Sequence, residues 1–162
     1  MRHPLKPMAV MLLLTLATPC ALQAGETPQP KPAAPEAPKA ASAGPEHVVV
    51  QHILIGFAGS VPGKNITRTT EEARKLAEEL LARARKGEDF DALVKQYTDD
   101  AAPGIYGMAN TGVRPGTAET PRTGMVKGFG DASFSLAVGE VGMAPYDPKA
   151  SPYGWHVIKR LK

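Results

Sequence analysis

The chain has 162 residues, of which 43% are hydrophobic and 22% charged, as in a globular protein of one domain with tails. The net charge is +3, and loss of a leader that contains Arg2 and Lys6 would lower it to about +1. Because this charge is small and no basic stripe with interleaved aromatic residues is present, nucleic acid is not expected as a partner.

Residues 1–24 have the pattern of a secretory signal peptide. Two cations near the start precede an apolar stretch of ten residues, and small residues follow up to Gly25. The apolar stretch is too short to span a bilayer, which takes ~20 residues, so no integral membrane span is expected. The pattern predicts export to the periplasm or the outside of the cell, with cleavage after Ala24.

Cys20, the one cysteine of the sequence, lies inside this leader. A bacterial lipoprotein signal ends in a cysteine that becomes acylated, so an outer-membrane lipid anchor at Cys20 is an alternative, although Pro19 fits such a signal poorly. After cleavage behind Ala24 the chain would contain no cysteine. Disulfides, a thiol nucleophile and thiolate metal ligands would then be excluded.

The next segment, 25–45, is rich in proline and alanine and has no large apolar side chains, which predicts a disordered linker before a folded domain at 46–162. Hydrophobic periodicity and turn residues then predict seven elements in chain order. They are a strand at 47–57, helices at 69–86 and 89–97, a short strand at 105–108, a short helix at 131–136, and two strands joined by a turn near Asp147. This order predicts an α+β fold, with an antiparallel or mixed sheet and helices packed beside it.

Two histidines lie inside apolar strand-like stretches, His52 in "VVVQHILIGF" and His156 in "YGWHVIKRL". Both faces of the first stretch are apolar, so this strand is expected to be central, and a histidine there needs a hydrogen-bond partner. A single buried histidine most often only stabilises the core. Because the first and last strands of a small domain often pair, His52 and His156 are expected to be neighbours, which favours a shared role.

Other kinds of site have weak support. A zinc site would need a third ligand, and no carboxylate or cysteine stands at ligand spacing beside either histidine. The GxSxG motif of many serine hydrolases is absent. No metal and no cofactor are expected.

Four segments together resemble the parvulin-type peptidyl-prolyl cis-trans isomerases (rotamases). They are "QHILI", "TTEEARKLAEELLARARKGEDFDALVKQYTDD", "GMVKGFGDASFSLAVGEVG" and "SPYGWHVIKRL", and they occur in the family's order over nearly all of 47–162. No single segment is specific, but the combination is. The resemblance implies a parvulin-like four-stranded sheet surrounded by helices, and an enzyme that rotates Xaa-Pro bonds.

The resemblance also implies site residues. The two histidines of the family fall on His52 and His156, and its cysteine or aspartate after the second helix falls on Asp100. The apolar proline pocket falls on Met125 and Phe129.

Two further positions follow from segments that depart from the family pattern. In "GIYG", which stands for the family's "GDLG", Tyr106 takes the place of the pocket leucine and Ile105 that of the aspartate. Ser151 takes the place of a hydroxyl that bonds to the histidines, after a turn that is a few residues longer. The stretch between Gly107 and Met125 is also longer than in compact members.

The resemblance implies that the partners are unfolded or proline-containing polypeptides. The prediction is an exported isomerase that rotates Xaa-Pro bonds without covalent chemistry and assists folding in the cell envelope; the alternative is a non-catalytic peptide-binding chaperone module of the same fold. The first loop offers Lys64 and Arg68 but no adjacent arginine pair, so no strict need for phosphorylated substrates is expected. A monomer is expected.

Overall fold

The computed structural model of the protein describes residues 44–162. The predicted signal peptide at 1–24, with Cys20, and all but the end of the predicted linker at 25–45 lie outside the described residues. From residue 44 to the C-terminus, no helix combines the length and the apolar character needed to cross a membrane.

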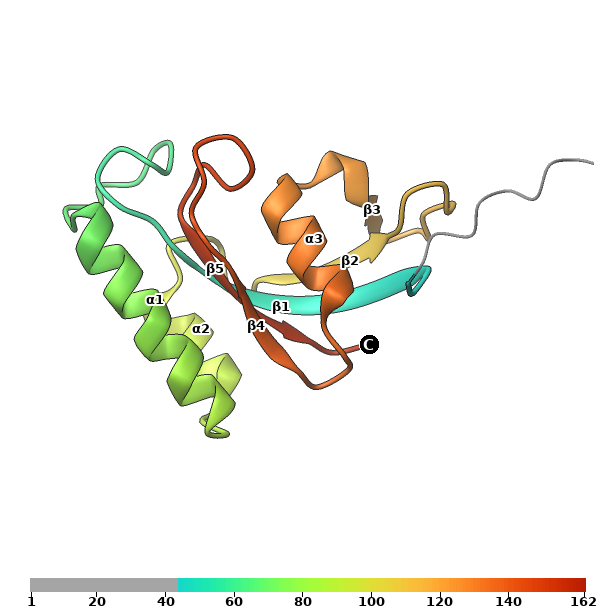
Figure 1. The fold of residues 1–162 in the computed structure, drawn as a ribbon, viewed down its shortest axis with the longest axis horizontal. Helices are drawn as coiled ribbons and strands as arrows, with labels where there is room; N and C mark the ends of the chain where they lie inside the picture. Colours follow the sequence, from blue (N-terminus) through green and yellow to red (C-terminus); the bar gives the residue numbers. More distant parts are fainter. Residues whose placement is uncertain (1–43) are drawn as a thin grey trace, which may run out of the picture. The chain divides into compact units, whose positions relative to one another are not determined.

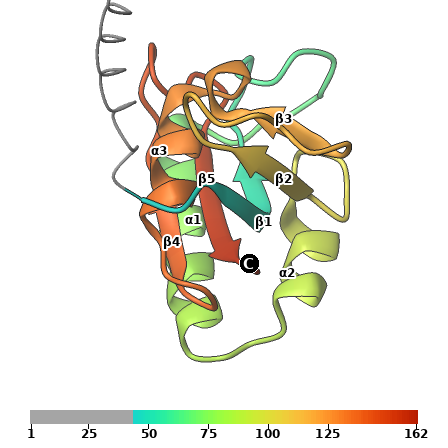
Figure 2. The ribbon, with the colours of Figure 1, turned by 90° about the vertical axis from the view of Figure 1, so that its right-hand side faces the viewer.

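A five-stranded mixed sheet forms the centre of the fold (Figures 1 and 2). Its strands are β1 (His47–Ile55), β2 (Ile105–Ala109), β3 (Glu119–Pro121), β4 (Val141–Ala144) and β5 (Trp155–Arg160). The spatial order is β3-β2-β1-β5-β4, and all neighbours are antiparallel except β2 and β3, which are parallel. The central place of the first strand and its pairing with the last are thereby confirmed.

Helices cover both faces of the sheet, which confirms the predicted α+β fold (Figure 1). On one face, α1 (Thr70–Arg85) and α2 (Phe90–Tyr97) share a core with Ile53 and Ile55 of β1. On the other face, α3 (Lys127–Ser135) shares a core with Val48 and Val50 of the same strand. The alternation of side chains along β1 thus supplies both cores.

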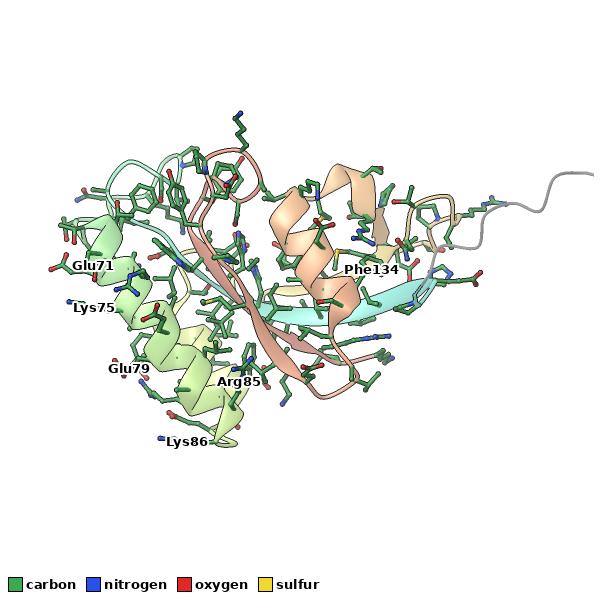
Figure 3. The ribbon with its side chains drawn as sticks, viewed as in Figure 1. Glu71, Lys75, Glu79, Arg85, Lys86 and Phe134 are labelled. Carbon is green, nitrogen blue, oxygen red and sulfur yellow. The ribbon has the colours of Figure 1, made fainter. Side chains whose placement is uncertain are left out.

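The first helix matches its prediction within one residue at each end. The Thr69 side chain accepts the backbone N–H of Glu72, and the Glu72 carboxylate accepts that of Thr69, so the predicted capping box is present. Leu80 lies fully buried on the inner face. Figure 3 shows charged residues of the outer face, such as Glu71 and Lys75, pointing away from the sheet.

Two expectations need correction. The sheet has five strands instead of four, because β3, in a stretch for which no strand was predicted, pairs with β2 at the edge. Three residues without alternating apolar side chains give no strand pattern in the sequence. The helix α3 begins at Lys127 and not at Asp131. The two glycines in its first half explain why the sequence pattern does not indicate this start, since glycine lowers helix propensity by ~1 kcal/mol relative to alanine.

Packing explains one of these glycines. The backbone N–H of Gly128 donates to the carbonyl of Ala150 at 2.6 Å, and a Cβ at this position would lie only 3.0 Å from that oxygen. A side chain at residue 128 would therefore push α3 away from the turn before β5. This contact holds the start of α3 beside the C-terminal strand.

Candidate active site

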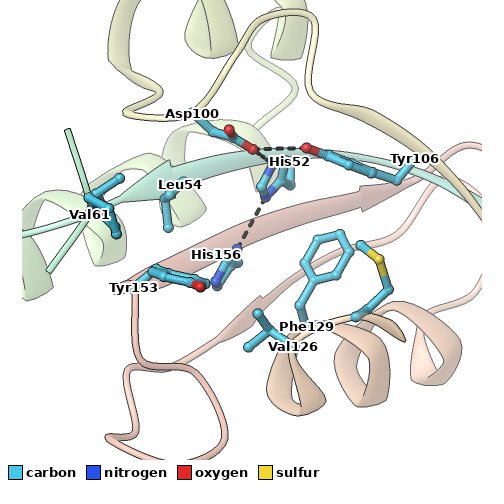
Figure 4. A pocket seen from close by; sticks show the side chains of 11 residues that line it. His52, Leu54, Val61, Asp100, Tyr106, Val126, Phe129, Tyr153 and His156 are labelled. Carbon is cyan, nitrogen blue, oxygen red and sulfur yellow. Dashed lines mark hydrogen bonds and ion pairs between the residues drawn. The ribbon is translucent and has the colours of Figure 1, made fainter. Parts of the chain in front are cut away.

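A pocket of about 310 Å³ opens on the face of the sheet that carries α3 (Figure 4). Six of the seven predicted site residues line it, namely His52, Asp100, Tyr106, Met125, Phe129 and His156. They come from β1, the segment after α2, β2, the segment just before α3, α3 itself and β5, so residues far apart in the sequence meet here.

Both histidines reach the pocket because of the register between β1 and β5. His156 lies opposite Leu54 and His52 lies opposite Ile158, so the two histidines are diagonal neighbours on one face. Their Nδ1 atoms are 3.2 Å apart. The expectation that they are neighbours is confirmed.

A chain of hydrogen bonds continues from the histidines to Asp100 (Figure 4). His52 Nε2 lies 3.0 Å from Asp100 Oδ2, and the Tyr106 hydroxyl donates to the same oxygen at 3.0 Å. The hydrogen bond with His52 is the main reason why the pKa of Asp100 lies well below its usual range; burial opposes this shift. Asp100 is therefore a carboxylate at neutral pH.

The same oxygen keeps Tyr106 protonated. Burial and the hydrogen bond to Asp100 raise the pKa of Tyr106 to about 12, in that order of importance. The phenol is therefore a donor at neutral pH. Its position next to Asp100 gives it a polar role in addition to the apolar one expected from the leucine that it replaces.

His156 stays neutral at pH 7. Burial, followed by the nearby charge of His52, lowers the pKa of His156 to about 3. The Nε2 atom of His156 is buried and has no hydrogen-bond partner in the described part of the chain.

Phe129 forms an aromatic wall of the pocket against the histidines. Its ring centre lies 5.0 Å from that of His52 at 67°, and 5.3 Å from that of His156. Tyr106 packs edge-on against both His52 and Phe129. These contacts restrict the two imidazole rings and keep the pocket beside them apolar.

The backbone around His52 and Asp100 is also tied together. The Thr98 hydroxyl accepts the backbone N–H groups of both Leu54 and Asp100, at 3.1 and 3.2 Å. On the other side, the N–H of His52 donates to the carbonyl of Gly104 at 3.0 Å. Gly104 has φ +65°, and a Cβ there would lie 2.6 Å from the His52 carbonyl oxygen, so glycine allows this approach.

Ser151 requires a correction. Its hydroxyl, expected to bond to the histidines, instead donates to the carbonyl of Gly154 at 3.0 Å, and Ser151 is not among the residues that line the pocket. The longer turn before β5 explains the difference. Its backbone closes through a bridge between Asp147 and Ser151, which turns the hydroxyl toward the turn itself.

Sequence reasoning did not predict the other residues of the pocket, Leu54, Val61, Pro62, Val126 and Tyr153. Two of them carried a signal in the sequence. Leu54 shares the face of His52 in an alternating strand, and Val126 follows Met125. Val61 and Pro62 lie in a loop and Tyr153 in a turn, where no periodicity indicates which side chains turn inward.

Among residues 44–162, no group of three or more His, Cys, Asp or Glu side chains is placed to bind a metal ion.

Comparison with known proteins identifies the family. The profile of the PPIC-type PPIase domain matches residues 39–162. The chain therefore belongs to the PPIC-type peptidyl-prolyl isomerase family, as the resemblance to parvulins indicated.

Curated relatives share this domain. The chain is 36% identical over 110 residues to the "Chaperone SurA" of Chromohalobacter salexigens, covering 68% of this chain and 21% of the relative. It is 40% identical over 85 residues to the "Foldase protein PrsA" of Geobacillus sp. (strain WCH70), covering 52% of this chain and 27% of the relative. The matches thus span about a fifth to a quarter of the length of these relatives.

Solved structures show the same fold. The peptidyl-prolyl isomerase ESS1 from Candida albicans superposes with a TM-score of 0.57 at 23% identity, covering 72% of this chain and 63% of that one. The solution structure of TbPIN1 superposes with a TM-score of 0.53 at 24% identity, covering 72% of this chain and 98% of that one. These two likenesses support the parvulin-like fold.

The low pKa of His156 predicts a loss of stability in weak acid. An unfolded histidine titrates near pH ~6.5. Its folded pKa of about 3 is lower, so its contribution is complete above pH ~6.5 and is lost as the pH falls toward 3. We expect the His156 imidazole NMR signals to remain those of a neutral ring at pH 5. The free energy of unfolding in urea should fall by at most ~1.4 kcal/mol per pH unit from this group.

The matched variant is His156→Phe, which should lose this part of the slope between pH 6.5 and 4.5 while keeping the loss below pH ~4 that protonation of Asp100 causes. A natural protein whose His156 signals titrate near pH 6.5 would contradict the burial argument.

Proposed function

We propose that the protein catalyses noncovalent rotation about Xaa-Pro bonds and that, once exported, it assists the folding of polypeptides in the cell envelope. The observation that carries this proposal is an apolar pocket with the ionised carboxylate of Asp100 at its edge. Membership in the PPIase family supports the activity. Relatives named as a chaperone and a foldase support the role in folding.

Rotation of a prolyl bond needs no covalent chemistry. Resonance sets a barrier of ~18–20 kcal/mol, so a catalyst only has to favour the twisted amide over the planar one. Because the planar amide is more polar than the twisted one, an apolar pocket around the proline ring favours twisting. Met125 and Phe129 supply such surfaces, and each ~1.4 kcal/mol of preference for the twisted state accelerates exchange tenfold.

Asp100 also favours the twisted amide, through its negative charge. The carbonyl oxygen of a planar amide carries more negative charge than that of a twisted amide, so a carboxylate beside it destabilises the planar state more. His52 and Tyr106 hold Asp100 Oδ2 in place and keep it ionised. His156 orients His52, and Ser151 supports the turn that leads to His156.

Exchange spectroscopy on Xaa-Pro peptides tests catalysis. The purified protein should broaden the cis and trans NMR signals, and Phe129→Ala should lower kcat/KM by about 10- to 100-fold, as expected for ~1.5–3 kcal/mol of lost apolar contact. Phe134→Ala is the matched control because Phe134 is a buried phenylalanine of the same helix that does not line the pocket. It should lower stability but leave kcat/KM within about threefold.

Both variants are compared at a temperature where circular dichroism shows them folded, and Met125→Ala, at a half-buried position, replaces Phe129→Ala if the latter does not fold. Peptide-induced shift changes without faster exchange would overturn the isomerase and leave the non-catalytic chaperone module. Equal losses in the Phe129 and Phe134 variants would remove the pocket from the mechanism.

The loop beside the pocket suits substrates without phosphate. Arg68 is engaged by Asp99, which leaves the exposed Lys64 as the other cation of the loop. One exposed cation contributes at most ~1 kcal/mol. Phosphorylation of serine in a Ser-Pro peptide should therefore change kcat/KM by at most about fivefold, measured by the same exchange experiment. A gain of about a hundredfold would show an anion site that these contacts do not provide.

Export rests on the sequence of residues 1–24. In bacteria that express the gene from its own start, the protein from the envelope fraction should begin at Gly25, as measured by mass spectrometry of the intact chain. An N-terminal Cys20 with added acyl mass would favour the lipid anchor. A chain that retains Met1 in the cytosolic fraction would contradict export.

A further inference from the structure

The 56–68 loop, which connects β1 to Thr69, the N-cap residue of α1, forms one side of the candidate pocket. It contributes Val61 and Pro62 to the pocket lining, and Figure 4 shows Val61 at the side away from Phe129. Near its tip, the Ser60 hydroxyl accepts the N–H of Phe57 and donates to the carbonyl of Tyr153. The position of this loop therefore decides how wide the pocket is.

An ion pair closes the base of this loop. The carboxylate of Asp99 accepts the N–H of Gly56 at 2.8 Å and also bonds to both terminal nitrogens of Arg68, the last residue of the loop. Arg68 donates in addition to the Gly56 carbonyl at 3.2 Å, and its own carbonyl accepts the N–H of Ala58 at 2.9 Å. The two ends of the loop are thus joined through one carboxylate.

This ion pair is more protected than a typical surface pair. The Asp99 side chain is 14% exposed and that of Arg68 is 28% exposed. The guanidinium contacts both carboxylate oxygens, which adds geometric specificity to the charge. Such a pair restrains a loop better than an exposed pair with one contact.

Asp99 is also connected to the acidic end of the pocket. It directly precedes Asp100, and its backbone N–H donates to the carbonyl of Leu54 at 2.8 Å. The segment that carries Asp100 is thus fixed to the end of β1, and the Asp99 side chain fixes the loop to the same segment. One residue sets both the apolar side and the charged edge of the pocket.

We propose that Arg68 and Asp99 are positioning residues that hold the 56–68 loop at the width required for an Xaa-Pro segment. The proposal rests on the proposed function, since the segment that it positions is the substrate. Neither residue lines the pocket, so both act through the loop. Their effect falls on affinity more than on turnover, because Asp100 itself keeps its bonds to His52 and Tyr106.

The test compares Arg68→Met, which removes the charge but keeps the stem, with Arg68→Lys, which keeps the charge but loses the fork. In the Met variant, KM for Xaa-Pro exchange and Kd from chemical-shift titration should rise about tenfold, as expected for loss of a charge-assisted contact. We expect kcat to change by less than about threefold, and the Lys variant to recover part of the affinity. Backbone amide signals of residues 58–64 should broaden in the Met variant.

Asp99→Asn tests the same contact from its other side. It should raise KM by a similar factor. The double variant with Arg68→Met should raise KM by no more than about the larger of the two single effects, because both changes break one interaction. Strictly additive losses would contradict a shared role.

The control is another ion pair, between Arg83 of α1 and Glu88 just after that helix, which lies outside the pocket and whose arginine is 27% exposed. Arg83→Met should leave KM and the amide signals of residues 58–64 unchanged. The proposal is overturned if Arg68→Met leaves KM and Kd unchanged, or if the Arg83 variant raises them equally.

Failure of the proposed function gives a different result. If the natural protein binds Xaa-Pro peptides but does not accelerate exchange, Kd still tests the loop. If it binds none of them, the proposed function falls, and unbroadened loop amides in Arg68→Met would then overturn the positioning role as well.

Discussion

The antiparallel pairing of β1 with β5 is the constraint on which the site depends. It joins the two ends of the folded chain at the centre of the sheet and places His52 and His156 on one face as diagonal neighbours. A shift of this register by one residue would turn one imidazole to the opposite face, where α1 and α2 pack. The apolar ladder that fixes the register therefore also aligns the hydrogen-bond chain.

The members of the hydrogen-bond chain differ in charge because their surroundings differ. His156 is buried and kept neutral, while Asp100, at the edge of the pocket, is kept ionised by the donors beside it. Charge is thus confined to the side where a substrate carbonyl would lie. The remaining wall, formed by Phe129 and its neighbours, is apolar. The pocket is therefore charged at one edge and apolar along its remaining wall.

One face of the sheet mainly stabilises the fold, and the other face carries the candidate site. The face covered by α1 and α2 holds a continuous apolar core, with Ile53, Leu80 and Val157 fully buried. The other face has a smaller core under α3, and polar side chains replace apolar ones where the pocket opens. Helix α3 approaches the turn before β5 closely at Gly128, whose backbone N–H donates to the Ala150 carbonyl. The buried polar groups of the site are tolerated because the opposite face supplies much of the apolar packing.

Elements with strong periodicity or capping signals could be predicted from the sequence alone. The first helix, with its capping box, and the central strand were predicted nearly to the residue because their patterns are local. Membership in the isomerase family was also evident from four segments in order. The structure then brought six of the seven predicted site residues into one pocket.

The remaining features depend on contacts between segments that are far apart in the chain. The short β3 and the start of α3 depend on contacts with distant segments. Two glycines lower the helix propensity at the start of α3, so the sequence pattern does not indicate a helix there. The inward turn of Val61 and Tyr153, the bond of Ser151 to its own turn, and the ion pair between Arg68 and Asp99 depend on how loops are held against the sheet. Loop residues carry no periodicity, so their direction is set by long-range hydrogen bonds, which a linear sequence does not display.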